Sequence, residues 1–384
     1  MTAPLDAAAL AARLIRRPSV TPHDEGAIPL LVETLQPLGF HCETVEFAEG
    51  GAPVLNLYAR IGRDGRNFCF AGHTDVVPPG DTAGWSVDPF AGVVKDGRLI
   101  GRGAVDMKGA IAGFTAAAAQ FLAARGQEFG GSISLLITGD EEGVAVNGTR
   151  KLLDWLASKG ETLDACIVGE PTSAHLLGDT VKIGRRGSLN GFLTVHGVQG
   201  HTAYPQLADN AAHRLIALLS ALTAGPLDEG SAHFQPSTLA VSTIDIGNRA
   251  TNVIPGIARA VFNIRFNDRW TSDSLRAWLK EKLDAAGGRY DLDIQVSGES
   301  FLVPPGEVSD LLTTAIHRGS GRTPELSTTG GTSDARFIHR FCPLAEFGLV
   351  NATMHKLDEQ VPLDDLAALT AIYRTVLDLY FPRR

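Results

Sequence analysis

Short apolar runs that end at acidic residues or histidines constrain this chain more than any other feature of its sequence. Residues 68–72, 132–138 and 164–168 are apolar runs of strand length, and helical patterns over 108–125 and 147–159 lie between them. Alternating strands and helices predict an α/β domain whose sheet is covered by helices. In such a domain, ligand sites form at the carboxyl ends of the strands. The acids and histidines that follow these runs therefore predict one shared site.

The pattern of the sequence changes after Ile183. The order strand, helix, strand, strand, helix, strand follows, which predicts a compact α+β unit with an antiparallel sheet. Helix and strand patterns like those of the first part return from Ser300. We therefore predict an α/β fold class in which a helix-flanked mixed sheet, formed by residues 1–183 and 298–384, carries an inserted α+β domain at 184–297.

Length and charge limit the partners of the chain. Its 384 residues suit two domains, and 34 basic against 43 acidic residues give a net charge of -9. Proteins that wrap nucleic acid usually carry the opposite sign, so we expect no nucleic-acid partner. No uninterrupted apolar run reaches the roughly 18 to 20 residues needed to cross a bilayer, so we also expect no membrane partner.

The N-terminus and the cysteines favour the cytoplasm. The first residues form an alanine-rich amphipathic pattern rather than the basic and apolar segments of a signal peptide. Cys42, Cys69, Cys166 and Cys342 stand far apart without a C-x-x-C pair. We expect reduced thiols in a cytoplasmic protein, with disulfides as the alternative.

His73 and Asp75 lie two residues apart directly after an apolar run. In an extended chain their side chains point to one face, so Asp75 can accept a hydrogen bond from one imidazole nitrogen while the other nitrogen binds a metal. A loop histidine beside a turn aspartate is the alternative. Asp106 precedes the long helix in a glycine-rich turn, where it is either a metal ligand or a helix N-cap.

Further acids follow the other apolar runs. Glu141 and Glu142 stand in DEEG, where three consecutive acids repel one another unless a cation lies among them; a solvated turn is the alternative. Glu170 ends another run, and His355 follows a later one, where a structural histidine is the alternative. Asn147 is expected to cap the helix after DEEG.

Together these residues suit two catalytic metal ions. Imidazoles and carboxylates without cysteine are typical of catalytic zinc, and also of cobalt or manganese, rather than of a closed structural zinc site. One bridging aspartate, with one histidine and one glutamate for each ion, would hold two ions and lower the pKa of a bound water towards about 7. Glu141 remains to carry a proton from that water to a departing amine. The expected ligands are His73, Asp106, Glu142, Glu170 and His355.

The motifs around these residues resemble those of a known enzyme family. The chain is similar to the di-zinc amidohydrolases and peptidases that include acetylornithine deacetylase, aminoacylase and carboxypeptidase G. The similarity runs nearly end to end and includes FAGHTDVVPPGD, GRGAVDMKG, DEEG, VGEPT, GRRGSL, GVQGHTAYP, NVIP, STTGGTSDARF and EFGLVNATMHKLDE.

The resemblance implies metal-dependent hydrolysis of a small N-acyl amino acid, with two Zn²⁺ per subunit that Co²⁺ or Mn²⁺ can replace. It implies that His73, Asp106 and Glu170 hold one ion. Asp106, Glu142 and His355 would then hold the other ion.

The resemblance also implies roles outside the ligand set. Glu141 would be the general acid and base, and Asp75 would orient His73. The inserted domain would be a dimerisation or lid domain, and His201 would reach into the partner's site of a homodimer to stabilise an oxyanion; a capping histidine is the alternative. Residues expected to contact the substrate are Arg185, Tyr204, Asn252, Arg265, Gly331, Thr332 and Asn351. For the two arginines, surface salt bridges are the alternative.

Other functions fit the sequence less well. A catalytically silent metal-binding protein would lack the general base or a ligand, whereas Glu141 and all five ligands are present. A nucleotide binder built on TGGTSD would need the P-loop lysine, which this motif lacks. Within the family, deacylases of other N-acyl amino acids, such as acetylornithine deacetylase, remain the alternative.

Overall fold

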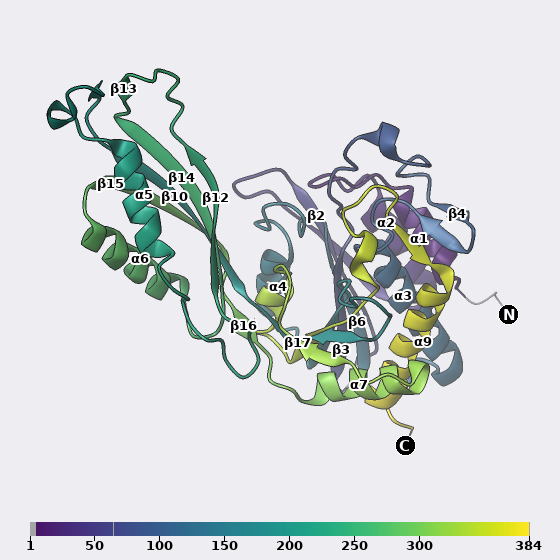
Figure 1. The fold of residues 1–384 in the computed structure, drawn as a ribbon. Helices are drawn as coiled ribbons and strands as arrows, with labels where there is room; N and C mark the ends of the chain where they lie inside the picture. The colour runs from purple at the N-terminus through teal and green to yellow at the C-terminus, as the bar shows by residue number, and fades with distance from the viewer. Residues whose placement is uncertain (1–4, 64, 384) are drawn as a thin grey trace. The chain divides into compact units, whose positions relative to one another are not determined.

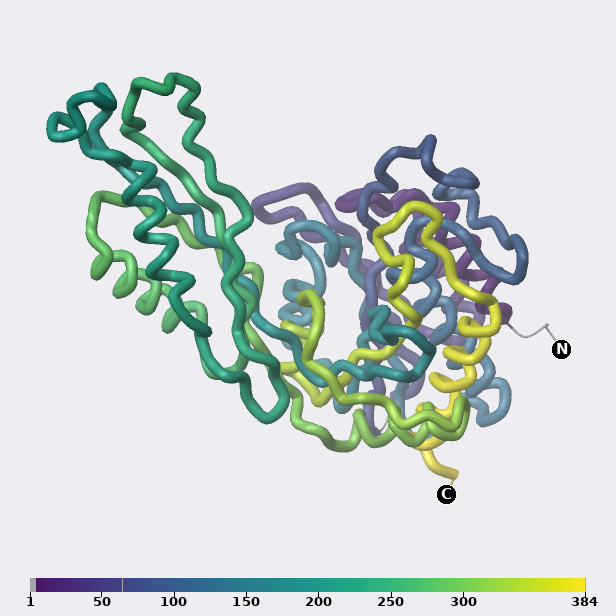
Figure 2. Tube along the Cα trace, in the orientation of Figure 1, coloured from purple at the N-terminus to yellow at the C-terminus, as the bar shows by residue number. Residues whose placement is uncertain are grey.

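The computed structural model of the chain describes residues 5–63 and 65–383 (Figure 1). The chain forms two compact units. The first contains the chain up to Ile183, Val303–Ser327 and the part from Ser333 onward, and the second contains Gly184–Leu302 and Thr328–Thr332. In the first unit, the C-terminal segments, yellow in Figure 2, return to lie among the N-terminal ones. In the described part of the chain, no helix is both long enough and apolar enough to cross a membrane.

A large mixed sheet organises the first unit. Its order is β1 (His41–Phe47), β2 (Val54–Ile61), β6 (Ser132–Thr138), β3 (Asn67–His73), β7 (Ala165–Val168), β18 (Leu344–Glu346), β8 (Thr180–Lys182) and β17 (Glu325–Ser327). The central strands β6, β3, β7 and β18 are parallel to one another, whereas β1, β2 and β6 pair antiparallel. The carboxyl ends of β6, β3 and β7 therefore meet at one edge of the sheet.

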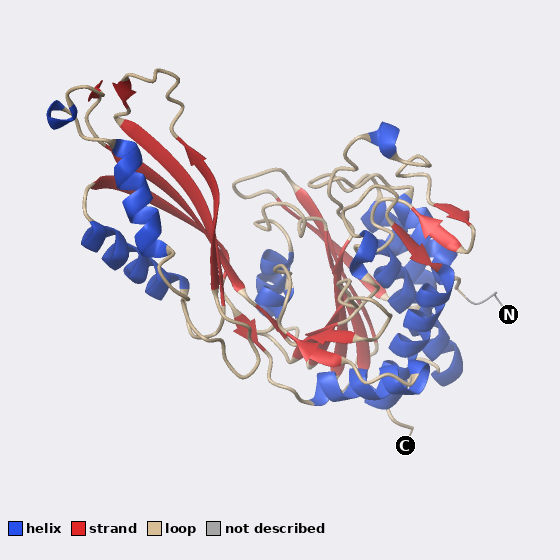
Figure 3. Ribbon diagram, viewed as in Figure 1, coloured by secondary structure: helices blue, strands red, loops and turns tan. Residues whose placement is uncertain are grey.

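Helices cover both faces of this sheet (Figure 3). They are α1 (Ala7–Ile15), α2 (Ala27–Leu35), α3 (Lys108–Arg125), α4 (Thr149–Ser158), α7 (Glu307–Ser320), α8 (Ala335–Ile338) and α9 (Leu363–Tyr380). On one face, α3 packs against α1 and α9; on the other, α4 contacts β2 and β6. The Phe114 ring stacks on Phe70 of β3 at 4.5 Å, and Tyr373 of α9 meets the Phe70 ring edge-on at 5.6 Å. These aromatic contacts fix the central strand that leads to the predicted site.

Shorter elements complete the first unit. A small sheet joins β19 (Gln360–Pro362), β5 (Arg98–Ile100) and β4 (Val93–Lys95), and short 3₁₀ turns lie at Gln36–Leu38, Thr82–Gly84 and Asn351–Thr353. Because β19 lies near the C-terminus and β5 directly precedes the glycine-rich turn before α3, this sheet joins two segments that each carry a predicted metal ligand.

The second unit is an antiparallel sheet with two helices on one face. The sheet order is β12 (Thr238–Asp245), β14 (Ile257–Phe266), β10 (Gly187–His196) and β15 (Arg289–Gly298), and the helices are α5 (Ala211–Leu222) and α6 (Ser272–Ala286). Two ribbons join β11 (Gly200–His201) to β13 (Val253–Ile254) and β9 (Gly184–Arg185) to β16 (Phe301–Leu302), and a 3₁₀ turn spans Pro205–Leu207. Its core is formed by apolar side chains of α5, α6, β10 and β14, separate from the core of the first unit.

Replacing Phe262 with alanine should destabilise the second unit by about 3–5 kcal/mol, because its ring is fully buried between the sheet and the helices. The measurement is denaturant unfolding followed by a probe in this unit. Phe192→Ala is the matched control, because Phe192 lies on the other face of the sheet and is 37% exposed. Equal losses for both variants would contradict this account of the core.

Two sequence expectations need correction. Asn147 does not cap α4, which has Gly148 at its N-cap; its side chain instead accepts from the Glu49 amide (3.0 Å) and donates to the Ala52 carbonyl (3.1 Å). The inserted segment also extends past the expected boundary at 297, because β16 pairs with β9. Residues 328–332 join the same unit, where Thr328 Oγ1 donates to the His233 carbonyl (2.6 Å).

Candidate metal centre

Three neighbouring strands deliver most of the predicted ligands to one edge of the sheet. His73 is the last residue of β3, Glu141 and Glu142 follow β6, and Glu170 follows β7. Because these strands are parallel, the side chains that follow them meet. Asp106 approaches the same edge from the turn before α3.

Asp106 lies between two imidazoles and turns one oxygen to each. His73 Nε2 is 3.1 Å from Asp106 Oδ1, and His355 Nε2 is 3.2 Å from Asp106 Oδ2. Each imidazole also has a glutamate beside it: His73 Nε2 lies 3.8 Å from Glu170 Oε1, and His355 Nε2 lies 2.8 Å from Glu142 Oε1. The aspartate therefore divides the cluster into two halves, each with one histidine and one glutamate.

Each half has the donor set of a catalytic zinc site. The potential ligand atoms of His73, Asp106 and Glu170 all lie within 4.8 Å of one another, and so do those of Asp106, Glu142 and His355. A third combination, His73 with Glu141 and Glu142, meets the same criterion. One imidazole and two carboxylates for each ion are typical of zinc sites that keep a coordination position open for water. The residues present thus fit a pair of divalent cations that share Asp106.

Asp75 supports both His73 and the loop that carries the glutamates. His73 Nδ1 donates to the Asp75 main-chain carbonyl at 2.9 Å and lies 3.5 Å from its carboxylate, which leaves Nε2 to face Asp106. The carboxylate accepts the main-chain N–H groups of Glu141 (3.2 Å) and Glu142 (3.0 Å). Asp75 thus fixes the direction of the imidazole and of two neighbouring acids.

The first acid of DEEG has a structural role. Asp140 is buried, and its Oδ2 accepts the Asn147 main-chain N–H at 3.0 Å, which closes the loop after β6. Glu141 and Glu142 remain directed at the cluster. The three consecutive acids therefore have different roles: Asp140 holds the loop, whereas Glu141 and Glu142 face the cluster.

The electrostatics of the cluster favour cations. Burial alone would lower the pKa of His73, but Asp106 and Asp75 outweigh it and raise that pKa well above its usual value. Hydrogen bonds to Asp106 and Glu142 raise the pKa of His355 to about 10. Desolvation, and then the charge of Glu170, raise the pKa of Glu141 well above that of an ordinary carboxyl group. The acids thus hold protons on both imidazoles when no other cation is present.

Binding of Zn²⁺ to the metal-free chain should release at least two protons between pH 7 and 8, because both histidines must be neutral to bind metal. The raised pKa of His355 stabilises the metal-free fold fully below pH 6.5, and that contribution is lost as the pH rises through about 10. The apparent affinity for zinc should therefore increase as the pH rises from 6.5 towards about 10. Calorimetry in buffers of different ionisation enthalpy measures the release. Zinc binding without proton uptake by the buffer would contradict this picture.

The second unit brings three predicted residues together. His201 of β11 pairs with Val253 of β13, and the Thr202 N–H donates to the Asn252 carbonyl at 3.0 Å. The rings of His201 and Tyr204 lie 5.8 Å apart, and both residues are exposed. His201 Nδ1 accepts the Ala203 N–H at 3.0 Å, so a neutral His201 ring carries its proton on Nε2.

The arginines of the second unit differ in their surroundings. Arg185 is buried, and its Nη1 donates to the Gly331 carbonyl at 3.0 Å, which ties it to the turn that contains Thr332. Its neighbour Arg186 was missed by sequence analysis. Burial, and then the charge of Arg265, lower the pKa of Arg186, and its Nε is buried without a hydrogen-bond partner among the described residues. The only sequence signal was the doubled arginine in GRRG.

Two further residues belong to the first unit. Asn351 begins the 3₁₀ turn before His355, and its N–H donates to the Ser173 carbonyl at 2.9 Å. Glu359, which sequence analysis also missed, is fully buried and accepts the Asp106 N–H at 3.1 Å. An acid in the MHKLDE motif was its only sequence signal.

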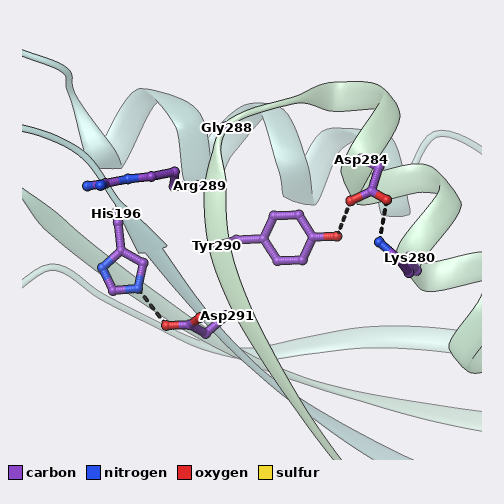
Figure 4. A pocket seen from close by; sticks show the side chains of 7 residues that line it. All are labelled: His196, Lys280, Asp284, Gly288, Arg289, Tyr290 and Asp291. Carbon is purple, nitrogen blue, oxygen red and sulfur yellow. Dashed lines mark hydrogen bonds and ion pairs between the residues drawn. The ribbon is translucent and has the colours of Figure 1, made fainter.

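A hollow on the second unit is less suited to binding a metal than the cluster around Asp106 (Figure 4). Asp284 binds both Tyr290 Oη (2.5 Å) and Lys280 Nζ (2.6 Å), and His196 Nε2 lies 2.7 Å from Asp291 Oδ2. These charged groups satisfy one another, so the hollow lacks the converging acids and imidazoles of the metal cluster.

Comparisons with known proteins show which family the chain is similar to. Residues 69–379 match the family model described as Peptidase family M20/M25/M40. A protein of Rhodospirillum centenum named succinyl-diaminopimelate desuccinylase is 59% identical over 377 residues, which cover 98% of this chain and 97% of the relative. A protein of the same name from Parvibaculum lavamentivorans is 57% identical over 386 residues, with 99% and 97% covered.

Solved structures share the fold at low identity. A tripeptidase from Staphylococcus aureus has a TM-score of 0.78 at 19% identity and covers 99% of both chains. An M20 family metallo-carboxypeptidase from Sulfolobus solfataricus has a TM-score of 0.77 at 18% identity, covering 98% of this chain and 99% of that one. A dinuclear metal-binding M20 peptidase from Bacillus subtilis reaches 0.67 at 15% identity, covering 97% and 98%.

Proposed function

This chain belongs to peptidase family M20/M25/M40, and on that premise we propose that it hydrolyses N-succinyl-LL-2,6-diaminopimelate to LL-2,6-diaminopimelate and succinate. Relatives that are 57–59% identical over almost the whole chain carry the name of this activity. The reaction breaks one amide bond with water, and it would supply diaminopimelate for lysine and cell-wall synthesis. The chain is then an amidohydrolase of a metal-dependent family.

The observation that carries the proposal is the position of Asp106 between His73 and His355, with one carboxylate oxygen towards each. His73, Asp106 and Glu170 would hold one zinc ion, and Asp106, Glu142 and His355 the other. Co²⁺ or Mn²⁺ can replace zinc with these ligands. Two such cations would polarise the amide carbonyl and lower the pKa of the attacking water.

Glu141 would move the proton during hydrolysis. Its side chain is close to the cluster and is not needed to complete either ligand set. It would take a proton as the water oxygen bonds to the amide carbon, and return that proton to the nitrogen as the C–N bond breaks. Asp75 would keep Glu141 in reach through its bond to the Glu141 main chain.

The second unit would act as the dimerisation or lid domain, and its His201 would complete the partner's site. The support is local: His201 is exposed, and its Nδ1 already accepts a main-chain N–H, so a neutral ring presents Nε2–H as a donor. A donor of this kind suits a developing oxyanion. Asn252, in the neighbouring strand segment, would enter the partner's site with it.

Mixing His201→Ala subunits with Glu141→Ala subunits should restore part of the activity that each variant lacks alone. The reason is that a mixed dimer would contain one site with both residues intact. Activity measured after subunit exchange, against each variant exchanged with itself, tests this. A mixture no more active than its components would mean that each subunit is self-sufficient.

Substrate carboxylates would be held by arginines of the second unit. Arg186 and Arg265 lie close enough to repel each other, and a carboxylate between them would relieve that repulsion. Arg185 would also contact a substrate carboxylate, and its bond to the Gly331 carbonyl would position the turn of Gly331 and Thr332. Tyr204 and Asn351 are further residues that would contact the substrate.

We further propose that the protein works in the cytoplasm. All four cysteines are free thiols, and three of them are buried in the first unit. Unpaired buried cysteines are typical of proteins in a reducing compartment.

The test is amine release from N-succinyl-LL-diaminopimelate by zinc-loaded protein, with N-acetylornithine and a succinylated monoamino acid alongside. Chelator-sensitive release from the first substrate alone is the expected result. Preference for N-acetylornithine would keep the mechanism but identify a deacylase of the alternative kind. Release from none of the three would refute the proposed hydrolase activity.

A further inference from the structure

One buried carboxylate fastens the loop that leads to the bridging aspartate. Glu359 is 0% exposed. Its Oε1 accepts the main-chain N–H groups of Val105 (2.8 Å) and Asp106 (3.1 Å), and its Oε2 accepts the N–H of Gly103 (3.1 Å). Arg102 Nη1 adds a charged hydrogen bond to Oε2 at 2.7 Å. Both oxygens of Glu359 therefore accept hydrogen bonds from four of the five residues between Arg102 and Asp106.

Glu359 belongs to the chain segment that carries His355. It stands four residues after His355 and directly before β19, and its own carbonyl accepts the Gly101 N–H at 2.9 Å. Thr353 binds Gln360 through two hydrogen bonds of 3.0 and 3.1 Å, which closes the turn that presents His355. The side chain of Glu359 thus connects the Asp106 loop to the His355 turn.

His355 depends on this connection more than His73 does. His73 ends the central strand β3, and Glu170 follows the adjacent strand β7, so the sheet itself fixes their spacing. His355 lies in a turn, at φ 59°, a left-handed conformation that non-glycine residues keep only where their surroundings hold them.

We propose that Glu359 is a positioning residue that sets the distance between Asp106 and His355 and thereby the affinity of the cation site they share with Glu142. The proposal rests on the two-cation function proposed above. Glu359 touches the main chain of Asp106 rather than its carboxylate, so it acts through the loop and not as a ligand. The site of His73, Asp106 and Glu170 should depend on it much less.

Glu359→Gln tests the proposal because it keeps the size of the side chain but replaces one acceptor oxygen with an NH₂ group. That group cannot accept the hydrogen bonds that the main-chain N–H groups and Arg102 now donate. The full chain loaded with two Co²⁺ is titrated with a chelator, and the visible absorption of bound cobalt reports each ion. We expect one ion to be held about 10- to 100-fold more weakly than in the wild type, and the other to change little.

Glu161→Gln is the matched control, because Glu161 pairs with Arg60 at 2.5 Å in the same unit, away from the cluster. It should release both ions like the wild type. Glu359→Asp, which keeps the charge but shortens the reach, gives the same test with a smaller effect if the glutamine variant does not fold. Unchanged release of both ions, or equal weakening of both, would overturn the positioning role. A wild-type chain that binds fewer than two Co²⁺ would instead overturn the two-cation site itself.

Discussion

Replacing Glu141 with glutamine is expected to lower kcat by about 100- to 10,000-fold, the usual contribution of general acid and base catalysis. Glutamine fills the same volume but cannot take a proton from water or return it to the amine. Desolvation and the charge of Glu170 raise the pKa of Glu141 in the metal-free chain, and nearby cations would lower it again towards the range useful for proton transfer. The measurement combines steady-state kinetics with metal analysis of the same samples.

The metal content separates this role from that of a ligand. Because two ligand sets are complete without Glu141, the glutamine variant should keep two ions per chain and an unchanged KM. Glu141→Asp, which keeps a carboxylate one methylene shorter, should retain more activity than the glutamine variant. Loss of an ion together with the activity would assign Glu141 to the third combination, with His73 and Glu142.

The sequence was sufficient to predict the sheet that positions the cluster. The fully buried strands β3, β6 and β7 consist largely of apolar residues, so their existence and approximate bounds could be inferred from the local sequence pattern. Parallel pairing then required only that α3 and α4 cross over between them. His73, Glu142 and Glu170 could be assigned to one edge because each follows such a run.

Features that depend on contacts between distant segments could not be predicted in the same way. Asn147 has the chemistry of an N-cap, but its amide is used by residues 49 and 52, almost a hundred positions away. Glu359 resembles a surface acid in the sequence, yet it is buried by a loop more than 250 residues earlier. Arg185 and Arg186 are neighbours in the sequence, yet Arg185 donates to the carbonyl of Gly331 and Arg186 lies near Arg265. Local patterns contain no information about such partners.

Replacing Asp106 with asparagine is expected to lower kcat by at least about 1,000-fold and to leave no more than one bound ion per chain. Asparagine offers a single acceptor oxygen, whereas the structure uses Oδ1 towards His73 and Oδ2 towards His355. Two cations then lack a shared anion, and the loss of about 4 kcal/mol of transition-state stabilisation corresponds to that factor. Kinetics and metal analysis after exhaustive dialysis measure both effects.

Glu170→Gln gives the comparison that makes the bridging role specific. Glu170 lies 3.8 Å from His73 and belongs to the ligand set of His73 and Asp106, so its loss should weaken one ion and leave the half formed by Asp106, Glu142 and His355 intact. In the Asp106→Asn variant both histidines lose a carboxylate that now raises their pKa values, so proton release on zinc binding should also fall. If Asp106→Asn retained two ions and released as many protons as the wild type, Asp106 could not be the ligand that joins the two halves.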